Sequence, residues 1–440
     1  MKKLWIILAL ALVLAGCKKE PDNTAAKATP TLDIGGTVVS QDAEILDLSV
    51  AEYDMTTVLS VAPKLTNVKT VELGNTDLPI NQLDGLREAF PAAKLSYTVS
   101  FMGTEIPSDT TSLDMTAMAV ENSDELADVA AKLPNLETID FVNDQGRCIY
   151  DLNTIHYLDI VRASVPDVKL EVNFQLFGKK VSSEDEQIKY ADVPIGNDGV
   201  PQIRAVLPYL QSCNYFLLDG CGIDNELLAT MRSDFPETKI VWRVWICAPE
   251  FRHTGYKNSH SFLTDTELIR TVKVRDFSSH DLMYCNETKY VDFGHNPFIS
   301  DFFFLSYMPD LEVAIIALTS VSDLTPLASC PKLEYLEIFT SEVTDLSPLA
   351  NCTELKHLNV SNLKIRDLSP LFGLTKLERL RVVSCPWITK AQLAEIAEKL
   401  PNCDVMTKGY DPTENGWRTD QNGNLAPRYA LLRKQMRYDY

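Results

Sequence analysis

The sequence of 440 residues lacks the short motifs that mark most enzyme active sites. It contains no Gly-x-Ser-x-Gly nucleophile elbow, no glycine-rich phosphate-binding loop, no His-Glu-x-x-His motif and no Cys-x-x-Cys pair. Each of these patterns holds a nucleophile, a phosphate cradle or metal ligands at a fixed spacing. We therefore expect that the protein is not an enzyme and that it binds no cofactor.

Basic residues are also scarce. The chain has 41 Lys and Arg residues against 61 Asp and Glu residues, and its formal net charge at pH 7 is −20. A surface of this sign repels phosphate groups, so nucleic acid and anionic lipid are poor partners. The hydrophobic fraction of 45% is typical of a folded chain that buries a sizeable core.

The ten cysteines do not form the dense framework of a disulfide-stapled domain. Nine of them follow Cys17, and this odd number leaves at least one thiol free. Cys330 and Cys352 fall at the same point of two successive repeats, where a buried thiol acts as a small hydrophobic side chain. We expect several cysteines to lie in the core.

Only the N-terminus carries a long hydrophobic run, from Leu4 to Leu14, and this run is short for a membrane span. Lys2 and Lys3 precede the run, and the sequence Leu-Ala-Gly-Cys ends it at Cys17. A basic segment, an apolar core and small residues before a cleavage point are the features of a secretory signal. The sequence Leu-Ala-Gly-Cys also resembles the lipobox of bacterial lipoproteins.

This resemblance implies that residues 1–16 are a signal peptide and that the thiol of Cys17 is acylated. Each methylene of an acyl chain contributes about 0.8 kcal/mol when it enters a bilayer. We therefore expect an extracytoplasmic protein that is anchored by lipid to the cell membrane. Residues 17–40 form the lipidated N-terminus and a flexible tether, because they are rich in small and polar residues. The alternative is an ordinary signal peptide that contains a cysteine.

A repeat of 22 residues runs through the C-terminal part of the sequence. Similar units begin at Val321, Val343 and Ile365, and a degenerate unit begins at Ile299. Three units contain a Leu-x-x-Leu-x-Leu frame in which Ile or Val takes the last position. Every unit has an aspartate near its start, and in three units a proline follows; these residues are Asp301, Asp323, Asp345, Asp367, Pro326, Pro348 and Pro370.

The repeat predicts one short strand and one helical turn in every unit. Alternate apolar residues of the leucine frame point to one face of a strand, while the aspartate caps a helical turn that tolerates proline. No unit buries its apolar face alone, so neighbouring units stack into a solenoid. The units resemble the internalin-like class of leucine-rich repeats, down to the phrase Asp-Leu-Ser-Pro-Leu. This resemblance implies an α/β leucine-rich repeat solenoid with a curved parallel sheet, whose regular repeats span residues 287–405.

Residues 41–247 show a longer and looser repetition. Helix-like sequences precede Pro134 and Pro236, and strand-like alternation follows Lys94, Lys169 and Lys239. We interpret this region as irregular repeats of a long helix and a strand that continue the same sheet. The alternative is a separate α/β domain of unrelated topology.

Two segments break the repeats. Residues 248–286 are expected to be an insertion or a junction, and residues 406–440 are expected to be a C-terminal capping tail. Several side chains in or near the first segment are of the types that bind zinc, but their spacing fits no known metal motif, so we expect no metal site. They are His253, His260, His280, His295, Cys285 and Asp292.

Strand residues that alternate with the buried leucines are expected to line the concave face of the sheet. Tyrosine and arginine are common anchors of protein interfaces, and the internalin resemblance implies a protein partner at this face. The candidate partner-binding residues, which we expect to be exposed, are Tyr335, Glu337, Phe339, His357, Asn359, Arg379 and Arg381.

The sequence thus favours a lipid-anchored surface scaffold that binds another protein through this face. Two alternatives stay open. One is a structural envelope lipoprotein that contacts cell-wall components, and the other is an enzyme with a site in residues 248–286 or in the irregular N-terminal half. Neither the partner nor the oligomeric state follows from the sequence.

Overall fold

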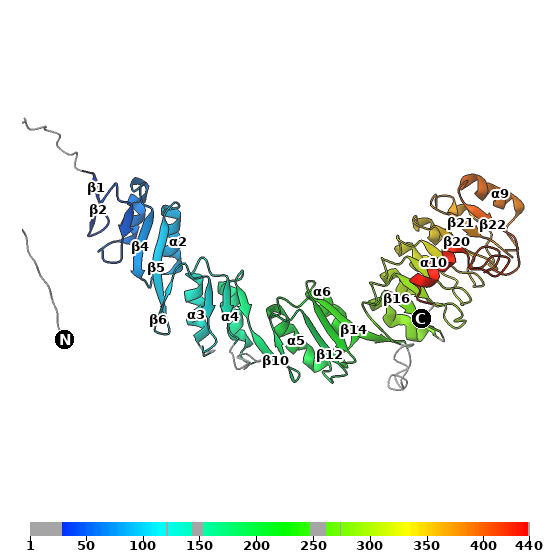
Figure 1. Cartoon of the computed structure of the whole chain (residues 1–440), viewed down its shortest axis with the longest axis horizontal. Coiled ribbons are helices and arrows are strands. Elements are labelled where there is room, and N and C mark those ends of the chain that lie inside the picture. Colours follow the sequence, from blue (N-terminus) through cyan, green and yellow to red (C-terminus); the bar gives the residue numbers. More distant parts are fainter. Residues whose placement is uncertain (1–28, 120–121, 143–152, 247–260, 273, 439–440) are drawn as a thin grey trace, which may run out of the picture. The chain divides into compact units, whose positions relative to one another are not determined.

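The computed structural model describes residues 29–119, 122–142, 153–246, 261–272 and 274–438 (Figure 1). Cys17, the rest of the expected signal peptide and lipobox, His253 and His260 lie outside these ranges. The chain divides into two compact units, which are described separately. The first holds the described residues of 29–113, 122–139 and 157–169, and the second holds the others. Within the described ranges, no helix has the length and apolar character needed to cross a membrane.

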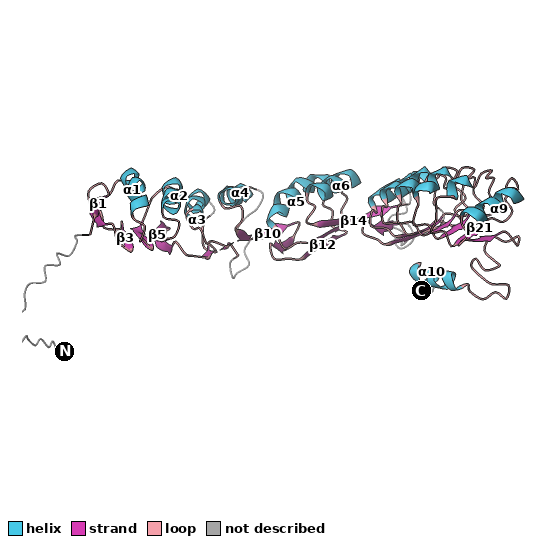
Figure 2. Cartoon of the chain, turned by 90° about the horizontal axis from the view of Figure 1, so that it is seen from above, coloured by secondary structure: helices cyan, strands magenta, loops and turns pink. Residues whose placement is uncertain are grey.

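Strands alternate with helices in the first unit, and the helices lie on one side of the strands (Figure 2). A four-stranded sheet has the order β3-β4-β5-β6, in which β3, β4 and β5 are parallel and β6 is antiparallel to β5. Its elements, with an N-terminal hairpin of β1 and β2, are β1 (Thr31–Asp33), β2 (Val38–Ser40), β3 (Ile45–Asp47), α1 (Met55–Val61), β4 (Thr70–Asn75), α2 (Ile80–Ala89), β5 (Lys94–Phe101) and β6 (Thr104–Pro107).

Further along the chain, short strands and helices continue to alternate. A three-stranded sheet has the order β7-β8-β9, and a hairpin of β10 and β11 follows. These elements are β7 (Ser112–Asp114), α3 (Ser123–Ala131), β8 (Thr138–Asp140), α4 (Ile155–Ser164), β9 (Lys169–Glu171), β10 (Asn173–Leu176) and β11 (Lys179–Ser182).

A second four-stranded sheet, in the order β12-β13-β14-β15, lies in the second unit. Strands β12, β13 and β14 are parallel, and helices α5 and α6 connect them. Helices and strands alternate in the described part of residues 41–247, but their strands form separate sheets, so the expectation that they continue the sheet of the C-terminal repeats is wrong. The elements are β12 (Gln187–Ala191), α5 (Val200–Val206), β13 (Tyr215–Asp219), α6 (Asn225–Asp234), β14 (Lys239–Trp245) and β15 (Ser261–Leu263).

Seven parallel strands form the sheet of the C-terminal repeats, in sequence order from β16 to β22. Residues 22 positions apart pair with each other, as Leu336 does with Leu358 and Leu358 does with Leu380. The α/β solenoid with a parallel sheet is thus confirmed. Its elements are β16 (Leu268–Arg270), α8 (Asp276–Ser279), β17 (Tyr290–Asp292), β18 (Val313–Ile315), β19 (Tyr335–Glu337), β20 (His357–Asn359), β21 (Arg379–Arg381), α9 (Lys390–Lys399), β22 (Asp404–Met406) and α10 (Pro427–Gln435).

The sheet of repeats begins before residue 287. Strand β16 and the turn after it lie within residues 248–286, which were expected to be an insertion or a junction. The repeat is hard to recognise in the sequence because Ile269, Val274, Leu282 and Cys285 fill its core in place of the leucine frame. The described part of this segment after residue 267 is therefore a repeat unit.

The repeated aspartates begin a short 3-10 turn in each regular unit. Asp323 accepts a hydrogen bond from the backbone N–H of Thr325 at 2.8 Å, and Asp345 and Asp367 accept equivalent bonds from Ser347 and Ser369. The proline that follows lies in the first positions of the turn, where no N–H is needed. The aspartates lie one residue before the N-cap positions, which are leucines, so they bind an N–H at the start of each turn but are not its N-cap residues.

The core of the solenoid lies between the strands and these turns. Cys330 and Cys352 are fully buried there, and their thiols donate hydrogen bonds of 3.3 Å to the carbonyl oxygens of Leu305 and Leu327. Burial raises the pKa of Cys330 to about 12 and that of Cys352 to about 11. These two cysteines are core residues, as expected.

Candidate functional site

We call the side of the C-terminal sheet that faces away from the leucine core the strand face. The middle residue of each strand, such as Leu336 or Leu358, points into the core and is fully buried. The first and third residues of each strand therefore point to the strand face. From β18 to β21 they are Val313, Ile315, Tyr335, Glu337, His357, Asn359, Arg379 and Arg381.

The expectation that the strand face is exposed is wrong in this structure. Six of the seven candidate partner-binding residues are at most 4% exposed, and the seventh, Arg379, is half-buried. The six are Tyr335, Glu337, Phe339, His357, Asn359 and Arg381. The cause is the chain itself, because residues 407–438 fold over this face. Their role in partner binding stays a prediction.

We call residues 407–438 the C-terminal segment. It runs as a loop from β22 to helix α10, which lies on the opposite side of the sheet from the connecting helices and turns (Figure 2). Trp417, Leu432 and Met436 are fully buried and pack into one hydrophobic cluster with side chains of β18 and β19. The sequence predicted a capping tail in this part of the chain. In the structure, the tail covers the strand face.

Glu337 is the centre of the polar contacts between the two parts. Its carboxylate accepts a hydrogen bond from the indole N–H of Trp417 at 2.7 Å and another from the Tyr335 hydroxyl. Arg418 donates to the same carboxylate from Nε at 3.1 Å and from Nη2. Glu337 has no solvent exposure, whereas the side chain of Arg418 keeps 22%. The pair thus places a carboxylate beneath the arginine, away from water.

The electrostatics of this centre follow from burial and from the ion pair. Burial lowers the pKa of Arg418, but the charge and hydrogen bonds of Glu337 outweigh that effect and raise the pKa above its ordinary value. Burial, and then the Glu337 carboxylate, raise the pKa of the Tyr335 hydroxyl well above 10.0. Arg418 therefore stays charged and Tyr335 stays protonated at neutral pH.

Aromatic rings surround the arginines at this interface. The guanidinium of Arg418 lies 5.7 Å from the centre of the Phe339 ring and 5.3 Å from that of Tyr429. Arg379 lies 4.5 Å from the centre of the Trp417 ring, and the Trp417 and Tyr335 ring centroids are 5.7 Å apart. In such cation–π contacts, the guanidinium is attracted to the face of the ring, so the attraction requires an aromatic side chain.

Polar side chains of the strand face bind the backbone of the segment. Arg379 donates to the carbonyl oxygens of Gly416 and Trp417 at 2.9 and 3.0 Å. Arg381 donates to the carbonyl of Asp411 at 2.7 Å, and Asn359 donates to that of Pro412 at 2.9 Å. These bonds reach main-chain atoms, which every polypeptide possesses.

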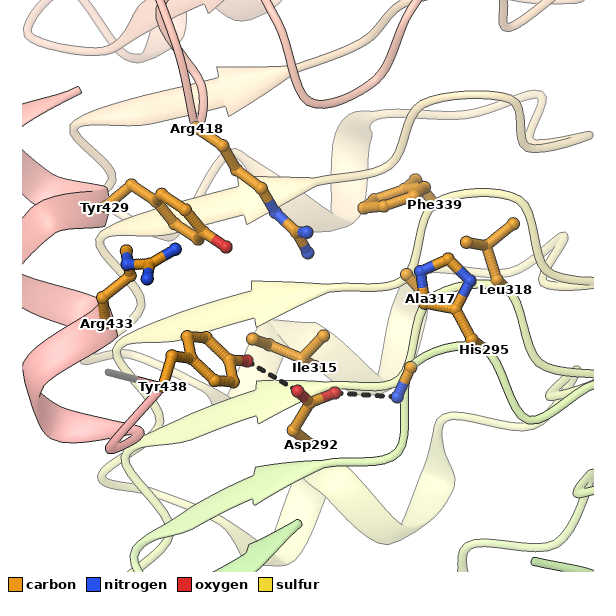
Figure 3. Close-up of a pocket in the computed structure, with 11 residues that line it drawn as sticks. Asp292, His295, Ile315, Ala317, Leu318, Phe339, Arg418, Tyr429, Arg433 and Tyr438 are labelled. Carbon is orange, nitrogen blue, oxygen red and sulfur yellow. Dashed lines mark hydrogen bonds between the residues drawn. The ribbon is translucent and has the colours of Figure 1, made fainter. Parts of the chain in front are cut away.

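The other end of the segment is held near β16 and β17. The Tyr438 hydroxyl donates to Asp292 at 2.6 Å, as Figure 3 shows, and Arg270 donates to the carbonyls of Met436 and Arg437 at 3.3 and 3.2 Å. Between α10 and the sheet remains a pocket of about 170 Å³, whose lining includes Asp292, His295, Phe339, Arg418, Tyr429 and Arg433 (Figure 3).

Some buried polar atoms of the strand face have no hydrogen-bond partner among the described residues. They are Nδ1 of His357 and the Nε and Nη1 atoms of Arg381. Burial, followed by the nearby charges of Arg428, Arg379 and Lys356, lowers the pKa of His357 to about 3. His357 is therefore neutral while the segment covers it.

The described members of the candidate zinc group have separate roles. Cys285 is fully buried in the core, and Asp292 accepts the hydrogen bond from Tyr438. His280 lies 3.8 Å from Asp301 at the surface, and His295 lines the pocket beside α10. Over the described ranges, no cluster of three or more His, Cys, Asp or Glu side chains is placed to hold a metal ion.

No protein-family model and no curated protein matches the sequence. Solved structures with similarity to the chain include an internalin C2 and a further internalin of Listeria monocytogenes and a leucine-rich repeat protein of Leptospira interrogans. In that order, the sequence identities are 21%, 13% and 13%, and the TM-scores are 0.27, 0.28 and 0.30. The matches cover 34%, 85% and 82% of this chain and 77%, 91% and 94% of those chains.

The fold assignment rests on the ladder of parallel strands, with its 22-residue step from β18 to β21 and one 3-10 turn in each regular unit. The chain has the fold of a leucine-rich repeat solenoid. In this solenoid, the sequence identified the strand face but not the side chains that cover it. Trp417 and Arg418 lie outside the repeats, and a single tryptophan in a polar loop was the only signal of burial there.

Proposed function

We propose that this leucine-rich repeat protein is an extracytoplasmic scaffold, anchored to the cell membrane by lipid on Cys17, that binds another polypeptide through the strand face. The observation that carries the proposal is the chemistry of that face. Arg379, Arg381 and Asn359 bind main-chain carbonyls, while Glu337 binds one arginine. A surface that holds a polypeptide of the same chain in this way has the groups needed to hold one from a partner.

The partner and the C-terminal segment compete for the same surface in this proposal. Two substitutions separate the two roles, because both break the same ion pair but only one changes the binding face. Arg418→Gln weakens the segment and leaves the strand face intact. Glu337→Gln breaks the same ion pair and also removes the carboxylate from the face.

Capture of proteins from envelope extracts and candidate host proteins tests the proposal, with residues 17–440 carrying Cys17→Ala as bait. We expect Arg418→Gln to raise capture of a specific protein by about tenfold, because binding strengthens with the fraction of uncovered strand face. Glu337→Gln should not raise it. Circular dichroism shows whether both variants remain folded.

Two outcomes contradict the proposed function. Equal capture by both variants would place the partner elsewhere on the molecule. Recovery of cell-wall fragments alone, independent of both substitutions, would favour the structural envelope lipoprotein.

A further inference from the structure

We infer that the strand face is a peptide-binding site whose resident ligand is residues 411–438 of the C-terminal segment, and that Glu337 forms its subsite for an arginine that follows an aromatic residue. The inference rests on the proposed function and names the chemistry of the partner. A polypeptide with an aromatic–arginine pair and a net positive charge fits this site.

The segment is separate from the core that holds the repeats together. Leu333, Leu336 and Ile338 are fully buried on the leucine side of the sheet, as are their counterparts in the next unit. Trp417, Leu432 and Met436 pack on the opposite side, against the strand face. Because each repeat buries its apolar face against its neighbours, the solenoid keeps its core when the segment leaves.

The charge of the segment is complementary to the protein that it covers. Residues 411–438 contain five basic and three acidic side chains, whereas the whole chain has a net charge of −20. Among these basic residues, Arg418 meets the fully buried carboxylate of Glu337. A partner of the same chemistry is attracted to the same place.

The contact between segment and face is less complete than the packing of the core. Nδ1 of His357 and two guanidinium nitrogens of Arg381 are buried without a hydrogen-bond partner among the described residues. Buried polar groups without partners oppose docking, because they regain hydrogen bonds to water when they are uncovered. The segment is therefore held by the subsite at Glu337, while the unpaired nitrogens of His357 and Arg381 oppose its docking. A ligand that is held and opposed in this way can exchange.

The first residues of the C-terminal segment, which precede residue 411, allow a direct test. Residues 407–410 are exposed, and Tyr410 is 93% exposed. A protease site inserted between Lys408 and Gly409 separates the segment from the folded protein after folding, without removing it beforehand. The starting protein is residues 17–440 with Cys17→Ala and this insertion.

The cleaved protein is mixed with a fluorescent peptide of residues 411–438, and binding is followed by fluorescence anisotropy. We expect the labelled peptide to replace the cleaved segment. A peptide with Arg418→Gln should bind about 100-fold more weakly or worse, because it leaves the buried carboxylate of Glu337 without its partner. The matched control is Arg437→Gln, which removes the same charge from an exposed contact with Glu267 at 4.0 Å and should weaken binding by no more than about threefold.

Hydrogen exchange on the uncleaved protein gives a second measurement. Backbone amides of residues 411–438 should exchange faster than those of β18, β19 and β20, because the segment opens while the sheet stays folded. Equal protection of segment and sheet, a cleaved segment that leaves only when the solenoid unfolds, or equal binding by the two variant peptides would each overturn the inference.

This test and the capture experiment fail independently. Exchange of the peptide without capture of any partner would support the peptide site and contradict recognition of another protein. Capture of a partner that the peptide does not displace would support the recognition function and contradict the peptide site.

Discussion

Glu337 and His357 occupy neighbouring strands of the same face and have opposite effects on the segment that covers them. Glu337 binds Trp417 and Arg418, so uncovering it breaks an ion pair and several hydrogen bonds. His357 gains no hydrogen bond at Nδ1 when it is covered. Glu337 therefore favours docking of the segment, whereas His357 makes docking depend on the protonation of its imidazole.

We predict that acid weakens docking of the C-terminal segment. The pKa of His357 is about 3 when it is covered and returns toward the ordinary histidine value of 6.5 when it is uncovered. Docking is therefore at full strength above pH 6.5, and it is lost progressively as the pH falls from 6.5 toward 3, because the uncovered state binds the proton more tightly. Between pH 7.5 and 5.5 the affinity of the cleaved segment should fall about tenfold.

Several charged or titratable groups surround this histidine, so the experiment needs a control that shows which group titrates. Arg428, Arg379 and Lys356 oppose its protonation, Glu378 lies 3.9 Å from Nε2, and the Tyr335 ring centroid lies 5.8 Å from that of the imidazole. His357→Gln should remove the pH dependence between 7.5 and 5.5 in the anisotropy assay. An unchanged slope in that variant would assign the effect to another group.

Each regular repeat places one non-glycine residue in the left-handed region after its strand. The positions are Leu318, Thr340, Asn362 and Ser384, with φ between 54° and 59°, and they recur every 22 residues. A side chain in this region costs roughly 1–2 kcal/mol because Cβ approaches the following carbonyl oxygen. The left-handed backbone conformation after the strand is thus a property of the repeat, and glycine would adopt it with less strain.

We predict that Ser384→Gly raises the free energy of unfolding by about 0.5–1 kcal/mol, because Ser384 is exposed and has a φ of 55°. The matched control is Ser329→Gly. Ser329 is also exposed, but it ends a 3-10 turn without a positive φ, so added backbone freedom should lower stability there. Urea unfolding of both variants measures the difference, and destabilisation by Ser384→Gly would show that its side chain has a role in this conformation.

The strands and turns of the C-terminal repeats could be predicted because their signal is periodic. Leu336, Leu358 and Leu380 recur at one spacing and pair with each other in the sheet. The orientation of the strand face follows from the same period. The unit of β16 was missed because its core uses Ile269, Val274 and Cys285 outside the leucine frame.

The cover over the strand face could not be predicted from the repeat. Trp417 and Arg418 contact Glu337 across 80 and 81 residues of chain, and they belong to no repeat unit. Pairing between distant segments depends on side chains that meet only in the folded chain. The sequence predicted a capping tail at residues 406–440 but not the surface that Leu432 and Met436 cover.

We predict that Cys17 places the whole molecule at the membrane. Cys17→Ala should abolish incorporation of a labelled fatty acid and move the protein out of the membrane pellet, because acyl chains on this thiol would supply the anchoring free energy. Cys385→Ala is the control, since this half-buried cysteine lies in the repeats. Lipid labelling that survives Cys17→Ala would contradict acylation at this residue.

Two fully buried thiols of the regular repeats report on whether the stack of repeats is intact. Cys330 and Cys352 lie on the leucine side of the sheet, bonded to carbonyls of the preceding unit. An alkylating reagent reaches them only when neighbouring repeats separate, whereas the half-buried Cys385 and Cys403 are accessible sooner. The order in which these thiols are modified therefore distinguishes a protein that has merely uncovered its strand face from one whose stack of repeats has come apart.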